Sequence, residues 1–195
     1  VTPALPRAQN RVLKKFLANK SAVIGAVIVG FFVLLALLAP FIAPFDPVKA
    51  DFLAVRKAPS AMYWFGTDEL GRDIYSRLLY GARITLYIAG LTALIITPLG
   101  MLIGASAGYL GGRVDTVLMR LVDIFLAFPS LILALAFVAA LGPGIENAII
   151  AISLSAWPPI ARLARAETLA IRKMDYIAAV RLQGASSWHI ILRHI

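Results

Sequence analysis

The sequence predicts an all-α protein that crosses a lipid bilayer several times. Of its 195 residues, 61% are hydrophobic and only 15% are charged. An average soluble domain is about 45–50% apolar and about 25% charged, and a small globule cannot hide such an excess. The apolar residues gather into long uncharged runs, and the few charges between them leave a formal net charge of +9. These observations exclude a soluble enzyme, a disordered chain and a fibrous repeat.

Four uncharged runs are candidates for membrane-spanning helices, each of which needs about 20 mainly apolar residues. They predict a first span at 21–45 and a transmembrane core over 84–195, with spans at about 84–108, 121–141 and 145–161. The fourth is short, because its uncharged part covers about 22 Å of a hydrocarbon core about 30 Å thick.

The first span is expected to be a helix that ends near Ala39. Pro40 and Pro44 follow, and proline cannot continue the backbone hydrogen-bond ladder. The run is too long for the apolar core of a signal peptide, and proline-rich sequence follows it where a small-residue cleavage site would be needed. We therefore expect an uncleaved anchor.

Two polar segments flank this anchor. The first, 1–20, is basic, and its part from 6 to 20 predicts either an amphipathic helix in the membrane interface or an ordinary charged flank. The second, 46–83, is expected to be an extracytoplasmic loop that is too small to hold a core of its own.

Charge asymmetry predicts that the N-terminus is cytoplasmic. In that orientation the inner segments, 1–20, 109–123 and 162–195, carry 13 basic and 4 acidic residues. The outer segments carry 6 basic and 6 acidic residues, so the whole net charge lies on one face. The positive-inside rule favours this arrangement.

The second span carries a glycine face. Gly100, Gly104 and Gly108 form two successive GxxxG steps, which predict close packing against another helix. Pro98 in this span and Pro129 in the third are expected to kink their helices.

The sequence offers no site for catalysis. It has no cysteine, its two histidines lie five residues apart, and it contains no nucleotide-binding glycine loop. We therefore expect neither an enzyme nor a chain that binds a metal, a cofactor or nucleic acid. Asp123 lies three residues after Arg120, which predicts a structural ion pair.

The cytoplasmic end predicts a short helix between two membrane-directed helices. The stretch 157–159 (Trp-Pro-Pro) is expected to break or bend the fourth span. Asp175 can then cap a helix over 176–183, Gly184 suits the left-handed residue that ends it, and Ser186 or Ser187 can cap the next helix. One side of the short helix, formed by Tyr176, Ile177, Val180 and Gln183, fits either a groove on a soluble partner or the protein's own bundle.

This loop, 174–188, resembles the EAA loop of binding-protein-dependent ABC transporter permeases, in which a coupling helix docks into the ATPase subunit. The matching stretch is Tyr176 to Ser186, with the glycine at Gly184 and the small residue at Ala179. Ala178 stands where the pattern has glutamate, and Val180 where it has a second alanine. The resemblance implies an ATPase-docking role for Asp175, Tyr176, Ile177, Ala178, Ala179, Arg181, Gly184, Ala185 and Ser186.

A second stretch, 65–78 (FGTDELGRDIYSRL), resembles the signature of the peptide/nickel permeases, the oligopeptide and dipeptide C-type subunits. We call it the signature loop. Its matching residues are Gly66, Thr67, Asp68, Gly71, Arg72, Asp73, Ser76 and Arg77. The blocks 109–123 and 128–130 are also similar to this family, so the likeness runs from about residue 11 to residue 195. It implies a type I ABC importer transmembrane domain, with four of an expected six spans present.

The resemblance also implies partners. They are a second homologous permease, two ATPase subunits that bind ATP and magnesium, an extracytoplasmic solute-binding protein, and the lipid of a bacterial plasma (inner) membrane. The implied function is to form half of a pathway for di- or oligopeptides and to couple it to ATP hydrolysis. Import of nickel or another small solute is an alternative. A structural or assembly membrane protein is an alternative of another class.

Overall fold

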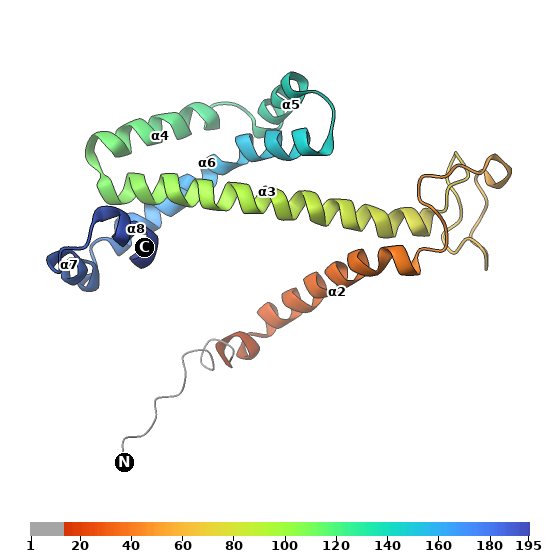
Figure 1. Cartoon of the computed structure of the whole chain (residues 1–195), viewed down its shortest axis with the longest axis horizontal. Coiled ribbons are helices and arrows are strands. Elements are labelled where there is room, and N and C mark those ends of the chain that lie inside the picture. Colours follow the sequence, from red (N-terminus) through yellow and green to blue (C-terminus); the bar gives the residue numbers. More distant parts are fainter. Residues whose placement is uncertain (1–13) are drawn as a thin grey trace, which may run out of the picture. The chain divides into compact units, whose positions relative to one another are not determined.

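The computed structural model describes residues 14–195, and its regular structure there is helical (Figure 1). The chain divides into two compact units between Tyr87 and Ile88, and each is described by itself. Residues 14–18 are helical and exposed. The rest of the expected amphipathic segment, 6–13, lies outside the described residues.

The first unit begins with helix α2, Lys20–Ile42. Asn19 caps it, with its Oδ1 accepting a hydrogen bond from the Ala22 N–H at 3.2 Å. The expected end near Ala39 is wrong, because Pro40 lies inside the helix. A proline this close to the end removes only one hydrogen bond from the last turn, and the helix continues for two more residues.

A loop with one short 3₁₀ helix, Phe52–Ala54, leads to the long helix α3, Ile74–Leu110. The loop expected over 46–83 is therefore shorter than predicted, since α3 begins ten residues before the second predicted span. Asp73 starts the helix, because its Oδ2 accepts a hydrogen bond from the Ser76 N–H at 2.7 Å. Pro98 lies within α3.

In the second unit, the third predicted span is broken. Helix α4, Gly112–Leu126, and helix α5, Ser130–Leu141, meet at an angle of 87°. Pro129 lacks an N–H group and disfavours helical geometry in the residue before it, so one helix stops and another starts. Much of the expected cytoplasmic loop 109–123 is thus helix.

Helix α6, Ile145–Ile171, contains the fourth predicted span and runs without a break through Pro158 and Pro159. The predicted break at 157–159 is therefore wrong, and the bend predicted as its alternative stays a prediction. Pro158 is fully buried, so packing holds the helix together. Nearby, Ser153 and Ser155 donate hydrogen bonds to the carbonyls of Ile149 and Ile152, at 2.7 and 3.0 Å. Membrane helices tolerate proline in such surroundings.

Two described helices, α2 and α3, are long and apolar enough to cross a membrane by themselves. The bent pair α4–α5 adds a third if it is one broken span. Helix α6 does not reach the same apolarity, because Glu146 and Arg162 lie at the two ends of its uncharged part. By length and composition, the described chain therefore has two or three of the four predicted spans.

Candidate functional site

The glycine face of α3 lies against α6 at very short range. A Cβ atom added at Gly104 would lie 2.2 Å from the Ala161 carbonyl oxygen, and one at Gly108 would lie 2.8 Å from the Thr168 Cβ. At Gly100 it would lie 2.8 Å from the Ile160 Cβ. The two backbones therefore approach as closely as small residues allow.

Polar contacts join the C-terminal half of α6 to its neighbours. Arg165 forms a two-pronged ion pair with Asp115 of α4, at 2.5 and 2.6 Å. Arg172 donates a hydrogen bond to the Gly108 carbonyl at 2.7 Å. Asp123 pairs with Arg162 at 2.6 Å, so the pair predicted between Asp123 and Arg120 is wrong. Sequence spacing suggested a partner on the same helix, but the fold brings one from α6.

The predicted short helix is α7, Asp175–Leu182. Asp175 is its first helical residue and not its cap, since Met174 occupies the capping position without a side-chain hydrogen bond. Its carboxylate still lies in the first turn, where a negative charge favours the helix dipole.

Gly184 ends α7 in the predicted left-handed conformation, with φ +83°. The Gly184 N–H bonds to the Arg181 carbonyl at 3.0 Å and the Ala185 N–H to the Val180 carbonyl at 3.4 Å, which is the Schellman pattern. Ser186 caps helix α8, Ser187–His194, through its Oγ and the His189 N–H. The turn is thus built as the sequence predicted.

One side of α7 packs against the rest of the protein. Ile177 is fully buried in a cluster with Tyr109, Ile190 and Ile191, and Val180 packs against that cluster. Of the two alternatives, Ile177 therefore packs on the protein's own bundle and not in a groove on a soluble partner, and Val180 is half-buried beside it. These apolar side chains find an apolar neighbour at the end of α3 first.

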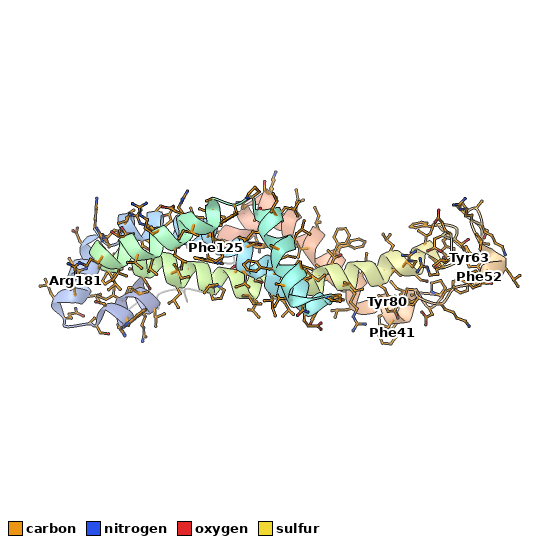
Figure 2. The ribbon with its side chains drawn as sticks, turned by 90° about the horizontal axis from the view of Figure 1, so that it is seen from above. Phe41, Phe52, Tyr63, Tyr80, Phe125 and Arg181 are labelled. Carbon is orange, nitrogen blue, oxygen red and sulfur yellow. The ribbon has the colours of Figure 1, made fainter. Side chains whose placement is uncertain are left out.

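The aromatic ring of Tyr109 also contacts a second residue of α7, Arg181. The Arg181 guanidinium, labelled in Figure 2, lies 5.2 Å from the centre of this ring, a cation–π contact. Tyr176 donates a hydrogen bond from its hydroxyl to the His194 carbonyl at 3.1 Å. The sequence included Tyr109 in a family block but gave it no role. Its place one residue beyond the glycine face was the available signal.

The outward side of α7 is small and apolar. Ala178 and Ala179 are exposed, and Leu182 is 90% exposed. Gln183, Gly184 and Ser186 are exposed beyond it, and Ala185 is half-buried. This set, which we call the outer face of α7, is the part of the predicted coupling loop that is free to meet another molecule.

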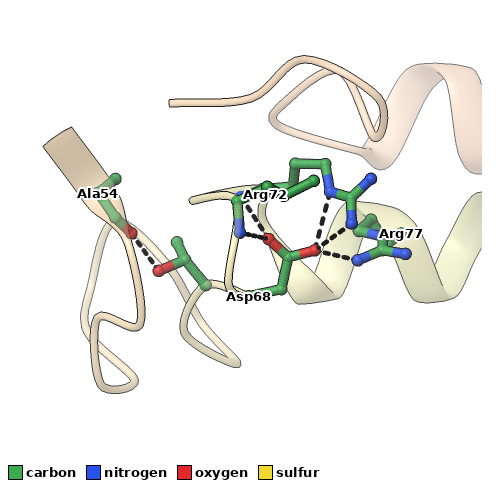
Figure 3. A network of polar contacts seen from close by, with 6 residues as sticks. Ala54, Asp68, Arg72 and Arg77 are labelled. Atoms are coloured by element: carbon green, nitrogen blue, oxygen red, sulfur yellow. Dashed lines mark hydrogen bonds and ion pairs between the residues drawn. The ribbon is translucent and has the colours of Figure 1, made fainter. Parts of the chain in front are cut away.

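In the first unit, the signature loop is a network centred on Asp68 (Figure 3). Its carboxylate accepts hydrogen bonds from the Leu70 and Arg72 N–H groups, both at 2.9 Å, and pairs with the side chains of Arg72 and Arg77. Burial raises the pKa of the Asp68 carboxyl, but the Arg72 side chain and these backbone donors outweigh it. The pKa therefore lies well below its usual range.

Thr67 and the two glycines close the signature loop onto the preceding segment. The Thr67 hydroxyl donates to the Ala54 carbonyl and accepts from the Lys57 N–H at 2.8 Å. Gly66 and Gly71 both have φ +74°, and a Cβ at Gly71 would lie 1.7 Å from the Asp51 carbonyl oxygen. Only glycine fits this approach.

Asp73 and Ser76 join the loop to the end of the first apolar segment. The Ser76 hydroxyl donates to Asp73 at 2.7 Å and accepts from the Phe45 N–H at 3.2 Å. Asp73 and Ser76 are both buried. The signature residues therefore fix the connection between α2 and α3.

Comparison with known proteins agrees with these features. Residues 97–195 match the family described as binding-protein-dependent transport system inner membrane component. Residues 10–59 match the N-terminal TM domain of oligopeptide transport permease C.

Several curated relatives are similar over most of the chain. The probable D,D-dipeptide transport system permease protein DdpC of Escherichia coli is 44% identical over 89% of this chain and 58% of its own length. The dipeptide transport system permease protein DppC of Bacillus subtilis is 36% identical, over 99% and 60%. The nickel transport system permease protein NikC of Escherichia coli is 39% identical, over 92% and 65%. The chain thus spans about three fifths of the length of these relatives, and it belongs to the family of binding-protein-dependent transport system inner membrane components.

Proposed function

We propose that this chain is a permease subunit of a bacterial ABC importer for di- or oligopeptides. It forms half of the translocation pathway in the plasma membrane and has its N-terminus in the cytoplasm. A second homologous permease forms the other half. Two ATPase subunits bind on the cytoplasmic side of the membrane, and a solute-binding protein docks on the extracytoplasmic side. The peptide substrate rests on the printed names of the dipeptide permease relatives.

The observation that carries the proposal is that α7 is anchored on one side and exposed on the other. Its inner side is anchored on Tyr109 at the end of α3, while its outer face is free. A helix that is anchored on one side and exposed on the other can transmit a movement of a bound ATPase to the membrane helices. Because α3 and α6 meet backbone to backbone at the glycine face, they move together as one body.

Coupling of this kind needs no catalytic residue in the permease. ATP and magnesium are held by the ATPase subunits, and closure of these subunits displaces α7. The displacement rocks the membrane helices and moves the opening from one side of the membrane to the other.

The test is to change the outer face of α7 and measure coupling. Leu182→Asp places a charge at its most exposed apolar residue, and Gly184→Pro replaces the left-handed glycine with a residue restricted to negative φ. In the reconstituted importer, both variants are expected to lose dipeptide uptake and substrate-stimulated ATP hydrolysis while still inserting in the membrane. Leu53→Asp, the same change at a residue that is also 90% exposed but lies outside the loop 174–188, is the matched control and is expected to retain both. Unchanged uptake and ATP hydrolysis in Leu182→Asp would contradict the proposal.

Nickel import is the second candidate, because the nickel permease relative is as similar to this chain as the peptide permeases are. Uptake of labelled dipeptide and of radioactive nickel in a strain that lacks the subunit separates the two. Purification of the chain without any ATPase would instead support a structural or assembly role.

A further inference from the structure

The two histidines of the chain lie side by side on α8. The ring centres of His189 and His194 are 5.6 Å apart, and the ring planes are inclined at 52°. His189 is exposed and His194 is half-buried. Among the described residues, neither imidazole ring takes part in a hydrogen bond, because the bonds at these two residues use the His189 N–H and the His194 carbonyl. The nitrogen atoms of both rings are therefore available to a ligand.

The end of α8 explains why residues five positions apart meet. In a regular α-helix such residues point in directions that differ by about 140° around the axis. Here the Ile195 N–H donates to the Ile190 carbonyl at 3.1 Å, a bond that spans five residues. This π-type bond widens the last turn, so that residues five apart lie nearly one above the other. The spacing that spoke against a metal pair in a regular helix is thus the spacing that suits this turn.

Both rings line one cavity. It has a volume of about 390 Å³ and lies between α8 and the turn that ends α7. Gln183 and Ser186 add an amide and a hydroxyl group to its lining, which is completed by Val180, Gly184 and Ala185. A water molecule takes up about 30 Å³ in the liquid, so an ion and several waters fit inside.

The distance between the rings fits a shared metal ion. A zinc–nitrogen bond is about 2.0–2.1 Å long, which places the centre of each imidazole ring about 3.2 Å from the ion. Two rings on one ion then have their centres about 5.2 Å apart at the tetrahedral angle, and at most about 6.4 Å apart. The observed distance of 5.6 Å lies between these two values.

The available donors indicate which ions the site suits. Imidazole nitrogens favour zinc, copper and nickel, whereas calcium and magnesium prefer oxygen ligands. Within residues 14–195, no third histidine or carboxylate joins the pair. The oxygen atoms of Gln183 and Ser186 belong to the same lining, and water can fill the remaining positions. Such a site is more open than a structural zinc site, which has four protein ligands.

We propose that His189 and His194 together bind one divalent transition-metal ion of the zinc, copper and nickel class. The ion joins the two ends of α8 and, through Gln183 or Ser186, connects this helix to the turn that ends α7. Binding requires no transport, so the site can be tested whether or not the subunit belongs to a peptide importer.

Zinc titration tests the site. The full-length subunit is purified in detergent with an affinity tag that contains no histidine, and zinc binding is measured by isothermal titration calorimetry. One zinc ion per subunit is expected to depend on both histidines, so His189→Ala and His194→Ala should each bind it at least about tenfold more weakly. Ser187→Ala, on the same helix but outside the cavity lining, is the matched control and is expected to bind zinc like the parent. Equal zinc affinity in the parent and in both histidine variants would overturn the inference.

Electron paramagnetic resonance with copper provides a second readout, which reports the ligands themselves and not the stability of the fold. With one Cu²⁺ ion per subunit, the parent is expected to show coupling to two imidazole nitrogens, and each single variant coupling to one. A parent spectrum with only one coupled imidazole, or a spectrum that stays the same in His194→Ala, would contradict a shared ion.

Discussion

Replacing Gly104 with alanine should separate α3 from α6. The added Cβ would lie 2.2 Å from the Ala161 carbonyl oxygen and 2.9 Å from the Arg165 backbone nitrogen. Both are backbone atoms of α6, so no side-chain rotation can make room. An ordinary contact between carbon and a carbonyl oxygen is about 3.3 Å or longer. The helices must therefore move apart by about 1 Å at this level.

The size of the effect follows from two opposing terms. Overpacking of a well-packed contact typically costs about 1–3 kcal/mol. Alanine is intrinsically better than glycine inside a helix by about 1 kcal/mol, which acts in the other direction. Gly90→Ala isolates the second term, because Gly90 lies on the same helix and a Cβ there would meet nothing within 4 Å.

The assay is the free energy of unfolding of the full-length protein, measured by denaturant titration in lipid–detergent micelles. Gly90→Ala is expected to be neutral or up to about 1 kcal/mol more stable than the parent. Gly104→Ala is expected to be less stable than Gly90→Ala by about 1–3 kcal/mol. Equal values for the two variants would refute the close backbone contact between α3 and α6.

Three further predictions follow from other parts of the chain. The pKa of the Asp68 carboxyl is lower in the folded protein than its ordinary 3.8, so its stabilisation is present above that pH and is lost as the pH falls through the folded value. Asp68→Asn should abolish this acid dependence, measured as protease resistance of the signature loop against pH. Gly71→Ala and Gly142→Ala both place a side chain at positive φ, which costs about 1–2 kcal/mol. Only Gly71 has a neighbour in the way, so in thermal unfolding it should lose more than Gly142, where a Cβ meets nothing within 4 Å. Tyr109→Ala removes a ring that is 8% exposed and should cost about 3–5 kcal/mol of unfolding free energy, whereas Tyr109→Phe keeps the ring and should cost much less.

Local rules predicted the turn chemistry of the chain well. Gly184 adopts the left-handed conformation and Ser186 caps the next helix, because each role is decided by neighbours within a few residues. The glycine face of α3 meets another helix, which its spacing alone indicated. The helix end predicted before Pro40 and the break predicted at Pro158 are wrong, because both helices continue through proline. Whether a helix continues when proline removes a backbone N–H donor depends on how deeply the proline is buried and how near it lies to the helix end. The neighbouring residues in the sequence do not determine either.

Contacts between residues far apart in the sequence were also not predicted. The sequence placed Ile177 on a face that fits either a partner or the bundle, and the fold buries it against Tyr109, 68 positions earlier. It also paired Asp123 with Arg120 on the same helix, although its partner is Arg162 of α6. In both cases, the residue type predicted the kind of contact, an apolar one or an ion pair, but not which residue is the partner.

The fold of α4 changes what the charges of the chain can say about orientation. The positive-inside prediction treats 109–123 as a loop, but from Gly112 onward this stretch is helix packed beside α3 and α6. Asp115 and Asp123 are neutralised there by arginines of α6, so these four charges act as pairs within the bundle and carry little weight in setting topology. The prediction of a cytoplasmic N-terminus therefore rests on the basic residues before α2 and after α6.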